Sequence, residues 1–500
     1  MISSPRCSRT FSSARGQSRA AARWSVLLVL LLASISPSLL LAADGASGTA
    51  SESTKPVDPS MQDKLDAIDD VARLRGIALG FQKREDWHHA ALAWKRLAVV
   101  RPHIGQYKLE MAAAYAMQDK KSEAYTALLE LQGQGYAYDI KDDPRFSKVA
   151  TTEVWQYIVV GFEANRVAFG DGGVAYTLPK DDLLIDSLAW DAGRKALLVG
   201  SARKGAVYVV GKGGKLKPLV TADDKNGMWA VMDLVVDAKR NRLWVASTAI
   251  PHFEGYSPEK DLGRAGIFEF ELGSGKFVRS YLSPEIPGQS FFLSSLALGA
   301  SGEVYAADGV NNAVYLVRDG QFKRMFHAPR LASIRGMTVS DDGKRLYFAD
   351  HELGVMGVEL ATGKPFDLLV PKNLALGGIE GMHWWQDSLI LVQNDMTPTR
   401  VMRLQLDESG RSVANVLPLA ANQESVSLPT MLTMDGEDIY FIANSQKGNY
   451  DRFGLLRNKE KLEGARIYRL NVNSVKPETD IEPFLNIGAN KPSGKAKPAE

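Results

Sequence analysis

Charged and hydroxyl side chains stand directly before a run of apolar residues that recurs six times along the chain. Asp186, Asp233 and Glu380 precede three of these runs, and the other three follow Ser294 and Ser295, Arg335 and Gly336, and Pro429 and Thr430. Carboxylates from separate segments can together hold a hard divalent cation, or act as general acids and bases. Carboxylates that share one site also shift each other's pKa, which is typical of functional sites. The chemistry open to these residues depends on whether the fold brings the six runs together.

The recurring run has the pattern of a β-hairpin. In residues 336–350 an apolar strand leads into the turn sequence Asp341-Asp342-Gly343 and then into a second apolar strand. The six copies begin at residues 188, 234, 296, 337, 382 and 431, which is the spacing of four-stranded blades. The sequence therefore predicts a mainly β fold, a six-bladed β-propeller over residues 151–488. Innermost strands begin at one mouth of the central channel, so the candidate residues should converge there.

The closure of this ring has two candidate strands, residues 174–178 and residues 481–485. Residues 155–160 are predicted to form the first strand after the N-terminal part. Two long insertions, residues 251–261 and 445–464, interrupt the second and the last blade. Long loops on a rigid ring often carry function, so we expect a lid or a contact surface there.

The chain before the propeller has helical periodicity. Apolar residues fall on helical stripes between residues 61 and 131, and Gly133-Gln134-Gly135 ends the pattern. This part resembles the tetratricopeptide repeat over roughly residues 71–136, through Leu74, Ala78, Phe81, Ala90, Trp94, Leu97 and Pro102 in one copy and Ala112, Tyr115, Ala124 and Leu128 in a second. We predict a helical tetratricopeptide-like domain over residues 61–150. It should lean on the propeller, because two repeats are fewer than a free solenoid needs.

The propeller itself resembles the senescence-marker-protein/gluconolactonase family over roughly residues 174–472. The resemblance rests on the order and spacing of residues 184–191, 378–382, 393–401 and 429–446. It implies a divalent metal ion, often calcium, held at the channel mouth by acidic and Asn side chains. It also implies hydrolysis of lactones or related esters with a carboxylate base. The catalytic and metal-binding roles would then fall to Asp186, where the family has Glu, and to Glu380.

The same comparison with the family pattern shows departures. Ser294-Ser295 replaces an Asn-Asp pair, and Arg335-Gly336 replaces Asn-Gly. A guanidinium stays protonated, so it is no metal ligand and repels a cation. In one alternative, Arg335 pairs with Asp186 or Glu380 and fills the metal's place, which leaves a polar plug or an anion-binding mouth. In the other, Arg335 points away and a cation is held by Asp186, Asp233, Glu380 and Asn394. The further candidate binding residues are Ser294, Thr430, Trp384 and His351.

The two ends of the chain differ from its body. Five Arg and no acid precede an apolar run at residues 26–35, which predicts a secretory signal over residues 1–43; an uncleaved anchor is the alternative. The only cysteine, Cys7, lies inside it, so thiol chemistry is excluded from the mature chain. Residues 44–60 have linker composition, and residues 489–500 have that of a disordered tail. The 60 basic and 58 acidic residues give no reason to expect nucleic-acid binding.

These observations support two hypotheses about function. In the first, the protein is exported to the periplasm or secreted, its catalytic site is degenerate, and it binds a small ligand at the propeller mouth or a protein partner through the helical repeats. In the second, it is a metal-dependent lactonase or esterase that uses Asp186 and Glu380. The sequence contains no phosphate loop, no serine-hydrolase elbow and no zinc-protease motif.

Overall fold

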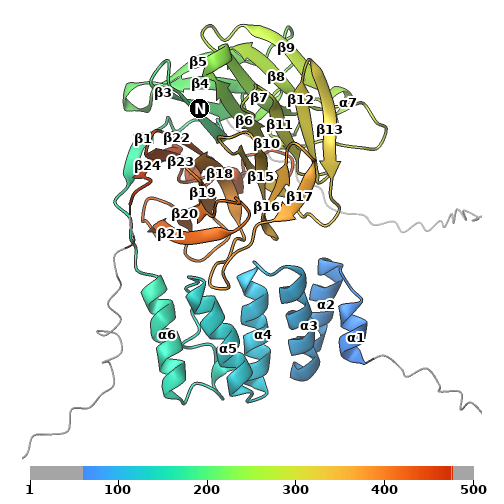
Figure 1. Cartoon of the computed structure of the whole chain (residues 1–500), viewed down its shortest axis with the longest axis vertical. Helices are drawn as coiled ribbons and strands as arrows, with labels where there is room; N and C mark the ends of the chain where they lie inside the picture. The colour runs from blue at the N-terminus through green and yellow to red at the C-terminus, as the bar shows by residue number, and fades with distance from the viewer. Residues whose placement is uncertain (1–59, 475, 477–500) are drawn as a thin grey trace, which may run out of the picture. The chain divides into compact units, whose positions relative to one another are not determined.

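The computed structural model describes residues 60–474 and residue 476 (Figure 1). The predicted signal segment, nearly all of the linker, the C-terminal tail and the alternative closing strand at residues 481–485 lie outside the described residues. Within the described ranges, no helix combines the length and the apolar character needed to cross a membrane.

Six α-helices precede the propeller and stand side by side in sequence order (Figure 1). They are α1 (Met61–Asp66), α2 (Val71–Lys83), α3 (Trp87–Val100), α4 (Gly105–Met117), α5 (Lys121–Gly133) and α6 (Glu153–Asn165), with a 3-10 turn η1 (Pro144–Phe146) before the last. Carboxylates of Asp70 and Asp86 accept backbone N–H groups at the starts of α2 and α3. The helical periodicity is thus confirmed, and the relation to the tetratricopeptide repeat stays a prediction.

Helix α6 corrects one strand prediction. Residues 155–160 lie inside α6, where the Thr152 hydroxyl caps the helix by accepting the N–H of Trp155 at 3.2 Å. Trp155, Ile158 and Phe162 are buried on one face. These residues have high strand propensity, but their spacing of three and four also fits a helix, and packing against α5 decides between the two.

The rest of the described chain forms six antiparallel four-stranded sheets, so the protein is a six-bladed β-propeller. Blades one to three are β2 (Ile185–Asp191) to β5 (Leu216–Thr221), β6 (Ala230–Asp237) to β9 (Phe277–Leu282), and β10 (Leu293–Leu298) to β13 (Gln321–His327). Blades four and five are β14 (Ile334–Val339) to β17 (Lys364–Asp367) and β18 (Ile379–Trp385) to β21 (Val413–Ala421).

The intermediate strands, in chain order, are β3 (Ala196–Ser201), β4 (Ala206–Val210), β7 (Arg242–Thr248), β8 (Ala265–Glu271), β11 (Val304–Asp308), β12 (Ala313–Arg318), β15 (Arg345–Asp350), β16 (Gly354–Glu359), β19 (Ser388–Gln393) and β20 (Arg400–Leu406). Short helices in the connections are α7 (Pro258–Asp261), η2 (Lys212–Gly214), η3 (Ala238–Arg240), η4 (Lys447–Asn449) and η5 (Lys459–Lys461).

The sixth blade closes the ring with strands from both ends of the propeller. It contains β22 (Leu432–Asp435), β23 (Asp438–Ile442), β24 (Arg466–Asn471) and, outermost, β1 (Gly173–Thr177). Strand β1 pairs antiparallel with β24, from Gly173 opposite Arg469 to Thr177 opposite Arg466. The first of the two closing segments, residues 174–178, is therefore the one used.

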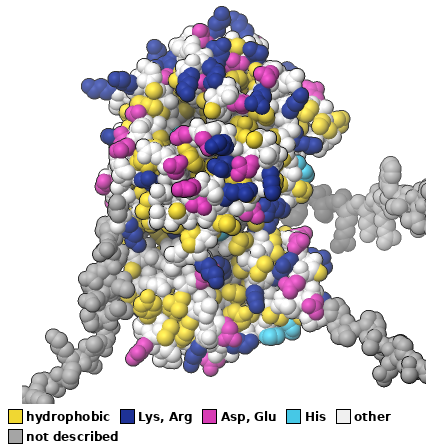
Figure 2. Space-filling model, in the orientation of Figure 1, with side chains coloured by type: hydrophobic (Ala, Val, Ile, Leu, Met, Phe, Trp, Pro, Cys, Tyr) yellow, Lys and Arg dark blue, Asp and Glu magenta, His cyan; other side chains and the backbone are white. Residues whose placement is uncertain are grey.

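Apolar residues fill the spaces between neighbouring blades, because each sheet has two faces to bury. The helices attach to the propeller at the connections before β16 and β18 and between β19 and β20. The guanidinium of Arg400 donates to the carbonyl of Gln134 in the helical part at 2.8 Å and to that of Ala375 in the propeller at 2.8 Å. Arg101 pairs with Glu352 at 2.5 Å. Basic and acidic side chains are interspersed over the face seen in Figure 2.

Candidate functional site

Each of the first five innermost strands has a β-bulge near its start. The pairing register shifts between residues 185 and 187, 231 and 233, 293 and 295, 334 and 337, and 379 and 381. A bulge leaves an extra residue unpaired and turns its side chain away from the regular alternation. The residues within these shifts are Asp186, Met232, Ser294, Arg335 with Gly336, and Glu380. Five blades therefore present equivalent positions at the channel mouth.

Asp186 is paired with a lysine from the other end of the propeller. Lys447 Nζ lies 2.6 Å from Asp186 Oδ2, and Asp186 Oδ1 has no hydrogen-bond partner among the described residues. Burial raises the pKa of Asp186; Lys447 opposes this shift, and the charge of Glu380 adds to it. Lys447 begins η4 in the long connection between β23 and β24. Lys447 lies outside the repeated pattern of the blades, so no periodic signal identifies it as a site residue.

Glu380 is the second acid of the mouth and also faces positive groups. Arg335 Nε lies 4.0 Å from Glu380 Oε1, and His351 Nε2 lies 3.6 Å from the same oxygen. The charges of Glu380 and Arg335 both act on Asp186, so these residues share one electrostatic environment. Arg335 therefore points toward Glu380. The alternative in which Arg335 turns away and leaves the acids to a cation is wrong.

The two acids receive their partners in the same way. His351 follows β15 in blade four and reaches Glu380 of blade five, and Lys447 follows β23 in blade six and reaches Asp186 of blade one. In both cases, the connection between the second and third strands of one blade supplies a basic side chain to the bulge acid of the next. Asn394 holds the place of His351 in blade five. It is half-buried, and its backbone N–H donates to Gly378 O at 2.9 Å.

Asp233 is a wall residue of the channel. Its carboxylate accepts the N–H of Leu234 at 2.8 Å and that of Leu296, in the next blade, at 2.7 Å. Burial raises the pKa of Asp233 to about 7, against the opposing effect of these two hydrogen bonds. The bulge position of its blade is taken by Met232. Ser294 also links blades, because its hydroxyl donates to Ile334 O at 3.0 Å.

Four buried polar atoms at the strand starts have no hydrogen-bond partner among the described residues. They are Asp186 Oδ1, Ser187 Oγ, Arg335 Nε and Thr430 Oγ1. Most buried polar atoms in proteins are satisfied, so each of these needs an explanation. Ser187 Oγ differs from the other three, because it lies beside Gly200 on the face of blade one that packs on Val231 of blade two. The atoms include an acceptor, a donor and two hydroxyls that can do either.

Trp384 does not join this mouth. It lies four residues beyond Glu380 on β18, about 13 Å along a strand. The Trp384 indole stacks on Tyr347 with 5.6 Å between ring centroids, and the backbone N–H of Trp384 donates to Thr338 Oγ1 at 3.0 Å. It lines the far part of a channel cavity of about 290 Å³ enclosed by the innermost strands.

The two long insertions contact each other beside the mouth. Tyr450 donates to Asp182 Oδ1 at 2.5 Å, and Arg203 pairs with Asp182 at 2.9 Å and donates to His252 O at 2.7 Å. Gly454 has φ +74°, and a Cβ there would lie 2.2 Å from the Pro251 carbonyl oxygen. Only glycine permits this close approach. The connection that carries Lys447 is therefore held in place by residues after Lys447.

The side chains at the mouth do not fit the divalent cation that the family resemblance implies. Such an ion needs several free oxygen ligands. Here, Lys447 occupies one oxygen of Asp186, and Arg335 and His351 face Glu380. In the described part of the chain, no group of three or more His, Cys, Asp or Glu side chains is placed to hold a metal ion.

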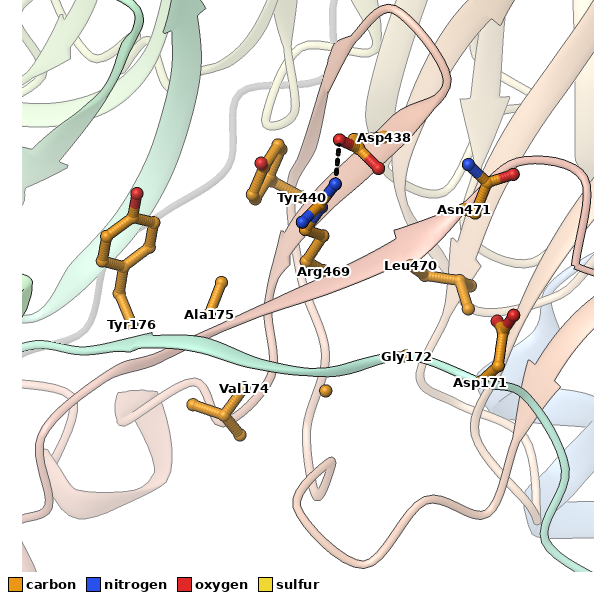
Figure 3. Close-up of a pocket in the computed structure, with 11 residues that line it drawn as sticks. Asp171, Gly172, Val174, Ala175, Tyr176, Asp438, Tyr440, Arg469, Leu470 and Asn471 are labelled. Carbon is orange, nitrogen blue, oxygen red and sulfur yellow. Dashed lines mark hydrogen bonds and ion pairs between the residues drawn. The ribbon is translucent and has the colours of Figure 1, made fainter.

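Two other clefts lie away from the mouth. One of about 570 Å³ lies beside β1, where Arg469 reaches toward Asp438 at 2.6 Å (Figure 3). Another of about 710 Å³ lies between the end of α3 and blade four, and its Arg96 pairs with Asp69 at 2.7 Å. In both clefts the charged side chains named here already have partners.

Comparison with known proteins found no matching family model and no matching curated protein. Solved structures share the fold. The PQQ-bound aldose sugar dehydrogenase of Streptomyces coelicolor is 15% identical, over 61% of this chain and 99% of that chain, with a TM-score of 0.42. A gluconolactonase of Xanthomonas campestris is 14% identical, over 61% and 97%, with a TM-score of 0.40.

A virginiamycin B lyase of Staphylococcus aureus is 15% identical over 60% of this chain and 99% of that chain, with a TM-score of 0.39. A gluconolactonase is thus among the solved structures similar to part of this chain. A shared propeller does not define an activity, because function depends on the residues of the site.

Proposed function

We propose that this protein binds a small polar ligand at the propeller mouth and that no metal ion takes part in that binding. The observation that carries the proposal is that Asp186, Arg335 and Thr430 each have an unsatisfied buried polar atom at the start of an innermost strand. Leaving a buried polar atom without a hydrogen bond costs about 1–3 kcal/mol. A protein keeps such atoms together where a ligand or ordered water satisfies them.

The surroundings of these atoms support the proposal. They sit on the starts of innermost strands, which the ring holds rigidly, and bulges aim the side chains of Asp186, Arg335 and Glu380. A rigid and pre-arranged site loses little conformational freedom when it binds. The mixture of donors and acceptors fits a ligand with several hydrogen-bonding groups.

Thermal shift and calorimetry with D-glucose, D-gluconate and D-glucosamine test the proposal. We expect at least one of these probes to raise the melting temperature saturably, and Thr430→Val to weaken its binding. The control is Thr362→Val, at an exposed turn away from the mouth. Binding by none of the three probes, or equal binding by Thr430→Val and the wild type, would contradict the proposal.

A metal-dependent lactonase is the second candidate function. One observation favours it: the two acids of the mouth, Asp186 and Glu380, act on each other electrostatically. It would require Lys447 and Arg335 to leave them. We therefore expect no chelator-sensitive hydrolysis of glucono-1,5-lactone. Hydrolysis that is lost both in chelator and in Glu380→Gln would replace the binding proposal with the enzyme.

The place of the protein in the cell and its partners also remain proposals. The basic and apolar N-terminal segment supports export to the periplasm or the medium. The helical part uses Arg101, His103 and Ala137 to contact the propeller, and its other faces are available to a protein partner. Fractionation of cells that express the tagged full chain tests export, and recovery only from the cytosol would contradict it.

A further inference from the structure

Lys447 places an ammonium group of the protein itself at the propeller mouth. Lys447 Nζ sits 2.6 Å from Asp186 Oδ2, although the Lys447 side chain is 41% exposed and that of Asp186 only 5%. The lysine thus reaches from the solvent side into a buried carboxylate. A solvent-exposed lysine gains little from a single ion pair in water, so the contact depends on the need of the buried acid for a cation.

Oxygen atoms remain available around this contact. Asp186 Oδ1 and Thr430 Oγ1 have no hydrogen-bond partner in the part of the chain that the structure describes. An ammonium group has three N–H donors, and Lys447 is seen to use them on Asp186 only. A freely placed ammonium could use the remaining oxygens, whereas Lys447 is limited by its attachment to the loop.

The charges at the mouth favour the replacement of one monovalent cation by another. Two acids, Asp186 and Glu380, face two basic side chains, Lys447 and Arg335. An incoming monovalent ammonium that displaces the lysine leaves the charge around Asp186 unchanged. A divalent ion would add a charge beside the Arg335 guanidinium, which cannot lose its proton.

We propose that the ligand of the mouth carries a primary ammonium group, which takes the place of Lys447 on Asp186. This inference rests on the proposed function and names the class of ligand for the same site. Lys447 is then a built-in competitor that keeps the buried carboxylate paired while the mouth is free of ligand.

The Lys447 side chain can leave Asp186 while the loop that carries it keeps its contacts. Its fixed points, Tyr450 on Asp182 and Gly454 against Pro251, follow Lys447 in the chain. Before it, Gln446 Nε2 donates to Asn444 O at 3.0 Å. The long lysine side chain can therefore turn out to solvent by rotation about its own bonds.

Chemical rescue tests the inference directly. In Lys447→Ala, Asp186 loses its cation, and n-propylammonium has the size of the part removed. We expect n-propylammonium chloride to raise the melting temperature of Lys447→Ala by several degrees more than that of the wild type. Asp186→Asn combined with Lys447→Ala should show no rescue. The matched control is Lys461→Ala, an exposed lysine of the same connection.

Three further probes separate the alternatives in the same assay. n-Propanol has the shape without the charge, tetramethylammonium has the charge without N–H donors, and Ca²⁺ tests for a metal ion. Rescue by n-propanol or tetramethylammonium equal to that by n-propylammonium would overturn the inference. Stabilisation of Lys447→Ala by Ca²⁺ but not by n-propylammonium would overturn it as well.

A sugar pair distinguishes this inference from the proposed function. Removing the competing lysine in Lys447→Ala should raise the affinity for D-glucosamine relative to that for D-glucose by about tenfold. If both sugars bind equally and Lys447→Ala changes neither, ligand binding at the mouth stands and the ammonium inference fails. If neither sugar binds and n-propylammonium does not rescue, both fail.

Discussion

The two ends of the same innermost strands differ in how their polar groups are satisfied. At the far end, backbone N–H groups of Trp190 and Trp384 donate across blade junctions to Thr433 and Thr338, each at 3.0 Å, and one buried side-chain donor there, Trp384 Nε1, has no partner among the described residues. At the mouth, bulges interrupt the ladder and three buried polar atoms have no partner among the described residues. The regular end holds the ring together, and the irregular end is free to bind. This contrast separates stability from function within single strands.

The largest effect on stability is expected from a far-end side chain. Tyr347 is fully buried, stacks on Trp384 and donates its hydroxyl to Gly410 O at 2.7 Å. Tyr347→Ala should lower the free energy of unfolding by about 3–5 kcal/mol, because it leaves a large cavity. Denaturant titration measures the loss. A change in the affinity of the mouth for its ligand in this variant would break the contrast between the two ends.

Asp233 gives the next largest effect, and it depends on pH. Its pKa is raised to about 7 in the folded protein, above the 3.8 of an ordinary aspartate. The folded state thus holds the proton more tightly, so this group stabilises the protein at low pH. That stability is fully present below about pH 4, falls by up to ~1.4 kcal/mol per pH unit as pH rises toward 7, and is gone above about pH 7.

The variant Asp233→Asn should lack that component of the pH dependence. Melting temperatures of the two proteins between pH 4 and 8 are the measurement, with each difference referred to the value at low pH. Parallel pH profiles would show that Asp233 does not hold its proton in the folded state, and that the backbone hydrogen bonds outweigh its burial.

A smaller loss is expected at the far end of blade six. Thr433→Val keeps the shape of the side chain but removes the acceptor of the Trp190 N–H. The unsatisfied donor should cost about 1–3 kcal/mol. Chemical denaturation with the wild type as reference measures the cost. No loss would mean that the far end is not held by these junction hydrogen bonds.

The smallest effect sharpens the comparison, because it comes three residues earlier in the same chain segment. Thr430 Oγ1 is buried without a partner among the described residues, so Thr430→Val removes no hydrogen bond to another described residue. Its stability should lie within about 0.5 kcal/mol of the wild type, or slightly above it. A loss as large as that of Thr433→Val would show that Thr430 is satisfied in the folded protein, and the mouth would lose part of its distinctive character.

Much of the fold follows from sequence patterns. The six repeated apolar segments and the turn residues between their strands predict the first two strands of each blade. Both signals, the alternation of apolar and polar residues and the turn sequence, are local in the chain. Four site residues occupy fixed positions relative to the repeated apolar segments, and these positions predict that they lie close together: Asp186, Glu380, Arg335 and His351. A repeat fixes where its equivalent residues lie, so a part of the candidate site was predictable.

Other features depend on contacts that no local pattern contains. The bulges leave no mark on composition, and they decide that Met232 rather than Asp233 matches Asp186. Lys447 reaches its acid from a long irregular connection, whose path depends on the packing of Gly454 on Pro251. Trp384 was expected at the mouth through its closeness to Glu380 in sequence, but a strand carries it to the other end of the channel.

The placing of β1 on β24 has a mechanical consequence. Gly173 is opposite Arg469 and Thr177 opposite Arg466, so the upstream end of β1 and the downstream end of β24 leave the pair at the same side. A force that pulls these two ends apart would break the hydrogen bonds between β1 and β24 one at a time. Two strands resist force least in this geometry. The helices relieve this weakness: a pull from upstream of Met61 is borne first by the pair of Arg101 with Glu352 of blade four and by the bond from Arg400 of blade five to Gln134 O.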